Sequence, residues 1–239
     1  MNRVPTALPL QGRIIRSGLL SEVVLSWSTL AVLPLTVVVA DVAHAATEVE
    51  TVVQAIEAKY EDVNVLQAGF VQVTKSSVFG DERQEGKVVL KRPAKMRWEF
   101  TSGEGKQFIT DGQTMWIYTK ADNQVIRYAD ITGASSSADN LLQSLDKLGE
   151  VFNVTLDPKV PEDGNVALVL VPREAEAQVK KLRLVLSDSY VVQHLTVVDG
   201  FDNTTELTFN SVKLNGEAPD ELFQFEVPSG VELIDSGSL

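Results

Sequence analysis

The sequence has no cysteine and only two histidines, and these absences exclude several kinds of site. Without cysteine the chain cannot form a disulfide, a thiolate nucleophile, a zinc–thiolate centre or an acylated N-terminal cysteine. The two histidines show no spacing typical of a metal centre, and no glycine-rich loop leads into a helix that could receive a phosphate. We therefore expect no metal and no cofactor.

Basic residues are also scarce, since 21 Lys and Arg face 33 Asp and Glu in a chain of 239 residues with a formal net charge of -12. This balance repels phosphate backbones, so nucleic acid is not an expected partner. The composition is 44% hydrophobic and 23% charged, which is typical of a globular protein with a packed core.

Groups suited to catalysis are present only in unfavourable settings. His194 lies on a predicted strand, which favours a structural or surface role. Ser137 precedes a predicted helix and is better placed as an N-cap than as a nucleophile. Paired carboxylates such as Glu82 and Glu85 lie near a turn, where acidic residues are usually solvated. We therefore expect no enzymatic activity and no catalytic residue.

The N-terminal segment, residues 1–45, has the organisation of an export signal. Three arginines within residues 1–16 are followed by a mostly apolar stretch over residues 25–40. Ala43-His44-Ala45 then has the small-x-small form that signal peptidase recognises. The alternative is an uncleaved membrane anchor, but a spanning helix needs about 20 uninterrupted apolar residues, and this stretch contains Pro34. We expect cleavage after Ala45.

From Ala46 on, the hydrophobic spacing predicts one helix followed by a series of strands. Thr47-Glu48-Val49-Glu50 has the form of a capping box, and apolar residues then recur at helical spacing as far as Tyr60. From Val65 the period changes to two, and polar turns typical of antiparallel strands separate the runs. Further strands are predicted at residues 84–91, 96–101, 106–110, 114–118, 124–128, 151–156, 166–171, 179–186, 191–198, 206–214 and 223–227.

A second amphipathic helix interrupts the strands. Leu141, Leu142, Leu145 and Leu148 share one helical face, and Gly149 is predicted to end the helix. No alternation of strands and helices indicates a parallel sheet. The loops are too short to mark a domain boundary, so residues 46–239 are predicted to form a single domain with mainly β, α+β architecture: a large antiparallel sheet with helices on one face.

The strand at residues 95–101 is the most informative one. Met96, Trp98 and Phe100 alternate with charged residues, so all three project to one face of the sheet. Side chains of neighbouring strands are predicted to extend this face: Val88, Leu90, Phe108, Trp116 and Tyr118. Two interpretations remain open at this point, because a solid core and an apolar ligand cavity have the same composition.

Several motifs resemble the periplasmic outer-membrane lipoprotein carrier protein family, LolA. In order along the chain they are Gln84-Glu85-Gly86, Lys91-Arg92-Pro93, Met96-x-Trp98-x-Phe100, the run Asp111–Tyr118, and Phe223-x-Phe225-x-Val227-Pro228-x-Gly230-Val231. Each motif is weak alone, but their order and spacing behind an export signal make the resemblance specific. Together they span most of the predicted mature chain.

The resemblance implies an unclosed, curved antiparallel half-barrel with a helical lid over an apolar concave face. It implies that Arg92 helps to hold the lid closed. It also implies a cavity for the acyl chains of a lipoprotein. The expected lining residues are Met96, Trp98, Phe100, Phe108, Leu90 and Trp116 from the sheet, and Leu141, Leu142 and Leu145 from the lid.

The function implied is that of a periplasmic chaperone for lipoprotein transport in outer-membrane biogenesis. Such a carrier, expected here to be a monomer, takes acylated lipoproteins released from the inner membrane to the outer membrane. The implied partners are an inner-membrane ATP-driven lipoprotein-releasing transporter and an outer-membrane receptor. The alternative is a related envelope lipid-binding or structural module, built on the same half-barrel scaffold but with a different ligand.

Overall fold

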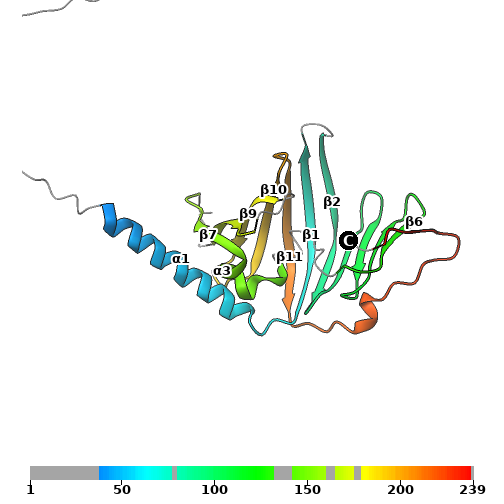
Figure 1. Cartoon of the computed structure of the whole chain (residues 1–239), viewed down its shortest axis with the longest axis horizontal. Helices are drawn as coiled ribbons and strands as arrows, with labels where there is room; N and C mark the ends of the chain where they lie inside the picture. Colours follow the sequence, from blue (N-terminus) through cyan, green and yellow to red (C-terminus); the bar gives the residue numbers. More distant parts are fainter. Residues whose placement is uncertain (1–37, 77–79, 132–141, 160–164, 175–178, 238–239) are drawn as a thin grey trace, which may run out of the picture. The chain divides into compact units, whose positions relative to one another are not determined.

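The computed structural model describes residues 38–76, 80–131, 142–159, 165–174 and 179–237 (Figure 1). From Val39 onward the chain forms one compact unit. Among the described residues, twelve strands form one sheet: β1 (Val65–Ser76), β2 (Gly80–Lys91), β3 (Lys95–Phe100), β4 (Lys106–Thr110), β5 (Met115–Thr119), β6 (Gln124–Tyr128), β7 (Phe152–Leu156), β8 (Val166–Pro172), β9 (Val179–Leu186), β10 (Val192–Asp199), β11 (Thr204–Leu214) and β12 (Glu232–Asp235).

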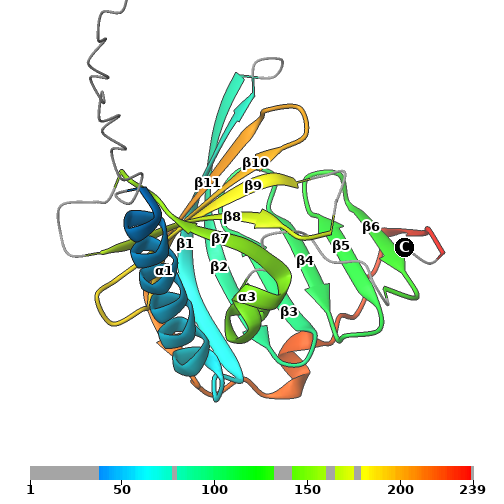
Figure 2. The same ribbon diagram turned by 60° about the vertical axis from the view of Figure 1, so that its left-hand side comes forward.

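The strand order is β12-β6-β5-β4-β3-β2-β1-β11-β10-β9-β8-β7, and every described pairing is antiparallel except that of β12 with β6. The two edge strands, β12 and β7, are at opposite ends of this order, so the sheet curves without closing (Figure 2). The predicted fold class, an open antiparallel half-barrel, is confirmed. Most predicted strands match within a residue or two, because turn residues separate clear runs of β-type sequence.

Helix α1 (Val38–Tyr60) and the short helix α3 (Leu148–Val151) lie on the concave side of the sheet (Figure 2). Val53, Ile56 and Tyr60 of α1 and Leu148 of α3 join one core cluster with side chains of the sheet. The apolar stripe predicted for the first helix therefore faces the sheet. Within the described residues, no helix is long and apolar enough to cross a membrane.

Helix α1 begins at Val38, earlier than the predicted start at Thr47, and it therefore contains Ala43-His44-Ala45. Residues 43, 45 and 46 are alanines, and alanine has the highest helix propensity, so the helix continues through the predicted cleavage site in the uncleaved chain. Of the predicted signal segment, residues 1–37 lie outside the described residues.

The second predicted helix differs from the structure in its boundaries. Its described part comprises Leu142 and Gln143, a 3-10 turn η1 (Leu145–Lys147) and α3, while Leu141 lies outside the described residues. Gly149 does not end the helix but lies within α3. Its backbone N–H donates to Glu57 Oε1 of α1 at 2.8 Å, so the two lid helices are connected here.

The prediction of a strand at residues 223–227 is wrong. The chain instead forms a 3-10 turn η2 (Asp220–Phe223) and crosses the outer side of the sheet before it enters β12. Phe223 is fully buried there in a small cluster with Val65 and Ala218. The alternating Phe residues therefore pack against the sheet and do not pair with its edge.

Ion pairs hold this C-terminal segment to the sheet. Asp220 accepts from Lys91 Nζ at 2.5 Å and from Lys95 Nζ at 2.7 Å, and these contacts lower the pKa of its carboxyl to about 2. Arg127 of β6 forms a two-point ion pair with Asp235 of β12, with Nε–Oδ1 at 2.7 Å and Nη2–Oδ2 at 2.9 Å. The segment is therefore fixed at both of its ends.

Candidate functional site

The concave face carries most of the residues predicted to line a ligand site. Strand pairing places Leu90 opposite Met96, and Trp98 between Val88 and Phe108, so these side chains share one face. The predicted lining residues are buried to different degrees: Leu90, Met96, Trp98, Leu142 and Leu145 are buried, whereas Phe100 and Phe108 are half-buried. The predicted sharing of one face by Met96, Trp98, Phe100 and Phe108 thus holds in the structure.

Aromatic rings run across this face from one strand to the next. The ring centroids of Phe70 and Trp98 are 4.7 Å apart, those of Phe70 and Phe100 are 5.2 Å apart in an edge-to-face arrangement, and those of Phe100 and Phe108 are 6.3 Å apart. Such contacts fix the rings relative to one another. The concave face therefore has a rigid aromatic floor beneath the helices.

Trp116 does not belong to this face, and its prediction as a lining residue is wrong. Phe108 pairs with Ile117, so Trp116, which pairs with Ile109, projects to the outer side of the sheet. Its ring lies 6.3 Å from that of Phe225 in the C-terminal segment. The aromatic run in β5 is thus covered from outside and not by the lid.

The same register brings residues to the concave face that sequence reasoning did not assign to it. Met115 packs against the main core cluster. Ile117 pairs with Phe108 and with Ile126, and Ile126 pairs with Ile234 of β12. The sequence indicated only that these strands are apolar. Which of their side chains face the lid depends on the strand register, and the sequence does not define that register.

These pairings form an apolar row across the open side of the concave face, comprising Phe108, Ile117, Ile126 and Ile234. Phe108, Ile117 and Ile126 are half-buried, and Ile234 is 37% exposed. In the described part of the chain, Ile117, Ile126 and Ile234 are not members of the core cluster beneath α1 and α3. The concave face thus has one side packed against the helices and one side that water can reach.

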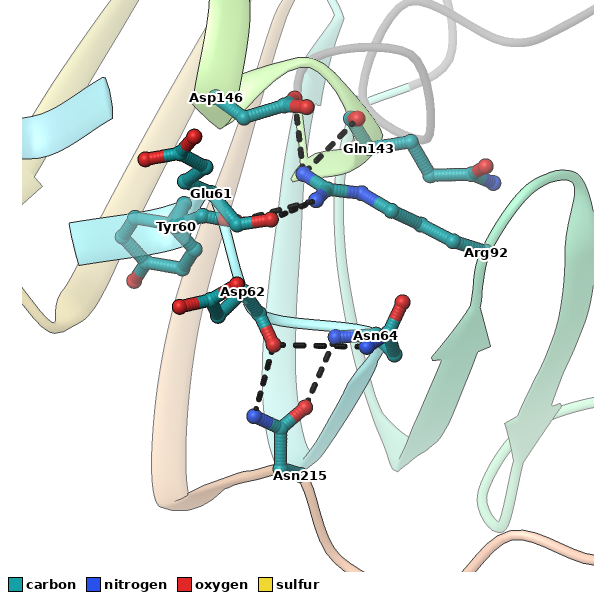
Figure 3. Close-up of polar contacts among 8 residues, drawn as sticks. All are labelled: Tyr60, Glu61, Asp62, Asn64, Arg92, Gln143, Asp146 and Asn215. Carbon is teal, nitrogen blue, oxygen red and sulfur yellow. Dashed lines mark hydrogen bonds and ion pairs between the residues drawn. The ribbon is translucent and has the colours of Figure 1, made fainter. Parts of the chain in front are cut away.

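Arg92, directly after the end of β2, connects the sheet to both parts of the lid (Figure 3). Its Nη1 donates to the carbonyl oxygens of Tyr60 at 3.0 Å and Glu61 at 3.4 Å, where α1 ends. Its Nη2 donates to the carbonyl oxygen of Gln143 at 3.5 Å and forms an ion pair with Asp146 Oδ1 at 2.7 Å. One guanidinium therefore contacts the end of α1 and the segment that leads into α3.

This arrangement follows from the chemistry of arginine. The last carbonyls of a helix have no partner within the helix, and a guanidinium offers several donors in a fixed plane. The Arg92 and Asp146 side chains are 20% and 29% exposed, so their ion pair is partly shielded from water and stronger than a fully exposed pair. The sequence contained no signal for Asp146 as the partner.

Tyr60 anchors the same end of α1 in the core. Its hydroxyl accepts a hydrogen bond from the Val192 N–H at 3.2 Å, and its side chain is almost completely buried. Burial raises the pKa of Tyr60, although the hydrogen bond from Val192 acts in the opposite direction. Next to it, Leu66, Leu90, Arg92 and Leu142 surround a pocket of about 10 Å³, room for about one water molecule.

Comparison with known proteins identifies the family. The model of the outer membrane lipoprotein carrier protein LolA family matches residues 61–226, which include strands β1 to β11, Arg92 and the segment containing Asp146. The chain belongs to this family. Its resemblance to LolA, suggested by the sequence motifs, is confirmed.

Individual LolA relatives match across most of the chain. The outer-membrane lipoprotein carrier protein of Legionella pneumophila (strain Paris) is 25% identical over 186 residues, which cover 77% of this chain and 90% of that protein. That of Alkalilimnicola ehrlichii is 31% identical over 181 residues, covering 74% and 81%. A crystal structure of a LolA superfamily protein from Nitrosomonas europaea aligns with 74% of this chain and 97% of its own, at 12% identity and a TM-score of 0.42.

Proposed function

We propose that this LolA family protein carries acylated lipoproteins through the periplasm from the inner to the outer membrane. The observation that supports the proposal best is the half-exposed apolar row of Phe108, Ile117, Ile126 and Ile234, which extends the aromatic floor beneath the lid. Acyl chains contribute about 0.8 kcal/mol per buried methylene, so crossing an aqueous compartment requires a surface of this kind to cover them.

The lid has to move for such a cargo to enter. The pocket at Arg92 has room for about one water molecule. The core cluster between sheet and lid includes four predicted lining residues, all buried: Met96, Trp98, Leu142 and Leu145. We infer that acyl chains first contact the apolar row at the open side, and that displacement of α1 and α3 then exposes the floor. The contacts of Arg92 would favour the closed lid and so help to expel the cargo.

The proposed partners are an inner-membrane ATP-driven transporter that delivers the lipoprotein and an outer-membrane receptor that accepts it. We propose that the carrier acts as a monomer. It needs no catalytic residue, because it moves its cargo without making or breaking a covalent bond. His194 fits a structural role, since its Nδ1 lies 3.1 Å from Thr208 Oγ1 on the neighbouring strand.

The decisive experiment is release of lipoproteins from spheroplasts. Adding the purified protein is expected to bring lipoproteins into a soluble complex of one carrier and one cargo, whose bound species mass spectrometry identifies. Recovery of phospholipids or other lipids in place of lipoproteins would favour the alternative of a general envelope lipid-binding module. Recovery of no lipidic species would contradict both functions.

We also propose that the carrier is made with a cleaved signal peptide. N-terminal sequencing of the exported protein is expected to begin at Ala46, directly after Ala43-His44-Ala45. Cleavage would shorten α1 to the part that starts near the capping box at Thr47. A membrane-bound form that retains Met1 would contradict the carrier function, because a tethered molecule cannot diffuse between two membranes.

A further inference from the structure

Asn215 holds the turn between α1 and β1 by three side-chain hydrogen bonds, of which Figure 3 draws those with Asp62 and Asn64. Its Oδ1 accepts from the backbone N–H groups of Asn64 at 2.8 Å and Val65 at 3.3 Å. Its Nδ2 donates to the carbonyl oxygen of Asp62 at 2.9 Å. Its own backbone N–H donates to the Val65 carbonyl oxygen at 2.7 Å. One residue therefore fixes the backbone from Asp62 to Val65.

Two independent demands select asparagine at this position. The backbone of Asn215 has a φ of 54°, in the left-handed region that asparagine tolerates better than most residues other than glycine. The contacts also require an acceptor and a donor on two separate atoms of one short side chain, which the asparagine amide supplies. Aspartate would keep the acceptor and lose the donor, and glycine would keep the backbone conformation and lose both.

Arg92 and Asn215 act on adjacent parts of the same turn. The Arg92 side chain holds the carbonyls of Tyr60 and Glu61, which belong to the end of the lid helix. The backbone N–H of Arg92 donates to the Asn64 carbonyl at 2.9 Å, on the sheet side of the turn. Tyr60 is also held by its buried side chain, by the Val192 N–H at its hydroxyl and by the Val63 N–H, which donates to its carbonyl oxygen at 3.1 Å, and opening of the lid would have to break these contacts as well as those of Arg92. Residues from Asp62 onward are held by Asn215 and by backbone bonds to the sheet.

We propose that Asn215 is a positioning residue that fixes the sheet end of the lid hinge, so that movement of α1 stops between Glu61 and Asp62. The proposal rests on the proposed carrier function, which requires α1 to move. With Asp62 to Val65 fixed, the next residue of β1, Leu66, keeps its place on the concave face while the lid is open. The register of β1 with β2 and β11 then remains intact through each cycle of loading and release.

Amide hydrogen exchange on the full protein tests this directly and needs no cargo. In an Arg92→Leu variant, the amides in the last turn of α1 are expected to exchange faster, while those of Asn64 and Val65 stay within about threefold of wild type. In Asn215→Gly, the amides of Asn64 and Val65 are expected to exchange about 10-fold faster or more, since each lost hydrogen bond weakens the local structure. Amides of the central strands β8 and β9 should be unchanged in both variants.

Asn215→Asp is the matched variant, because it keeps the two accepted bonds and places a carboxylate beside the Asp62 carbonyl. Protection of Asn64 and Val65 is expected to lie between wild type and Asn215→Gly. The proposal is overturned if Asn215→Gly leaves both amides protected, or if Arg92→Leu exposes them as strongly as the end of α1. Because no lipoprotein enters the measurement, either result is separate from failure of the carrier function.

Discussion

A Phe108→Glu variant is expected to lose at least about 10-fold in affinity for an acylated probe while keeping its fold. Phe108 is half-buried on the open side of the concave face, between Trp98 on one side and Ile117 on the other. A carboxylate there reaches water in the empty protein but must be desolvated when an acyl chain covers it, and that cost falls on binding. Titration with a fluorescent fatty-acyl probe measures the loss, and urea unfolding measures stability.

Gln107→Glu is the matched control for this variant. Gln107 lies on the same strand but on the opposite face, where it pairs with Glu99 and Tyr118. The same charge is added one residue away, and repulsion with Glu99 costs about 0.2–1 kcal/mol of stability. Probe affinity should equal that of wild type. Equal affinities for Phe108→Glu and Gln107→Glu would show that acyl chains do not bind to the concave face.

Trp98 is a poorer position for the same test, although it is the more prominent residue in the sequence. Its side chain is 6% exposed and packs against Phe70. A glutamate at this position would be an unpaired buried charge, and such changes cost about 3–5 kcal/mol of folding free energy. Loss of binding in Trp98→Glu would therefore not separate damage to the site from damage to the fold.

The sequence predicted the strands well and their mutual arrangement poorly. Alternation along residues 96–100 correctly placed Met96, Trp98 and Phe100 on one face, because the period of two is a local property of a strand. Trp116 was misplaced because its face depends on pairing with β4, and a shift of one residue exchanges the two faces. Strand β12 was missed because all four of its residues are exposed, so that no hydrophobic alternation marks it.

The polar contacts of the lid could not be predicted for a different reason. Arg92 was found through its motif, but its partners Gln143 and Asp146 lie about fifty positions away in the sequence. Asn215 contacts Asp62, Asn64 and Val65 across an even longer separation. Such contacts have no local periodicity, and they appear only when the curved sheet brings the ends of β2, β11 and α1 together.

An Arg92→Leu variant is expected to accept lipoprotein at least as readily as wild type and to transfer it at least about 10-fold more slowly. The leucine removes every side-chain contact of Arg92 with the lid and leaves the apolar concave face intact. Hydrogen bonds to charged groups contribute about 1.5–3 kcal/mol each, and 1.4 kcal/mol changes an equilibrium tenfold. Without the contacts, the open state that holds cargo gains population relative to the closed state.

Loading and transfer have to be measured separately to see this effect. Loading is followed with transporter-containing vesicles that carry a labelled lipoprotein, and transfer is followed from purified complexes to receptor-containing vesicles. Both carriers enter the second step with the same amount of bound cargo, so that a difference in loading cannot appear as a difference in transfer. Urea unfolding of the empty proteins shows how much of the change reflects stability alone.

Arg92→Lys separates the geometry of the contacts from the charge. Lysine keeps the positive charge near Asp146, but its single ammonium group cannot reach the carbonyls of α1 and of Gln143 in the planar arrangement that arginine uses. If the arginine closes the lid by joining its two parts, Arg92→Lys should transfer slowly, close to Arg92→Leu. If charge pairing with Asp146 alone is sufficient, Arg92→Lys should behave as wild type. Equal transfer by all three proteins at matched loading would show that closure of the lid by Arg92 does not drive release, and that release depends on the receptor alone.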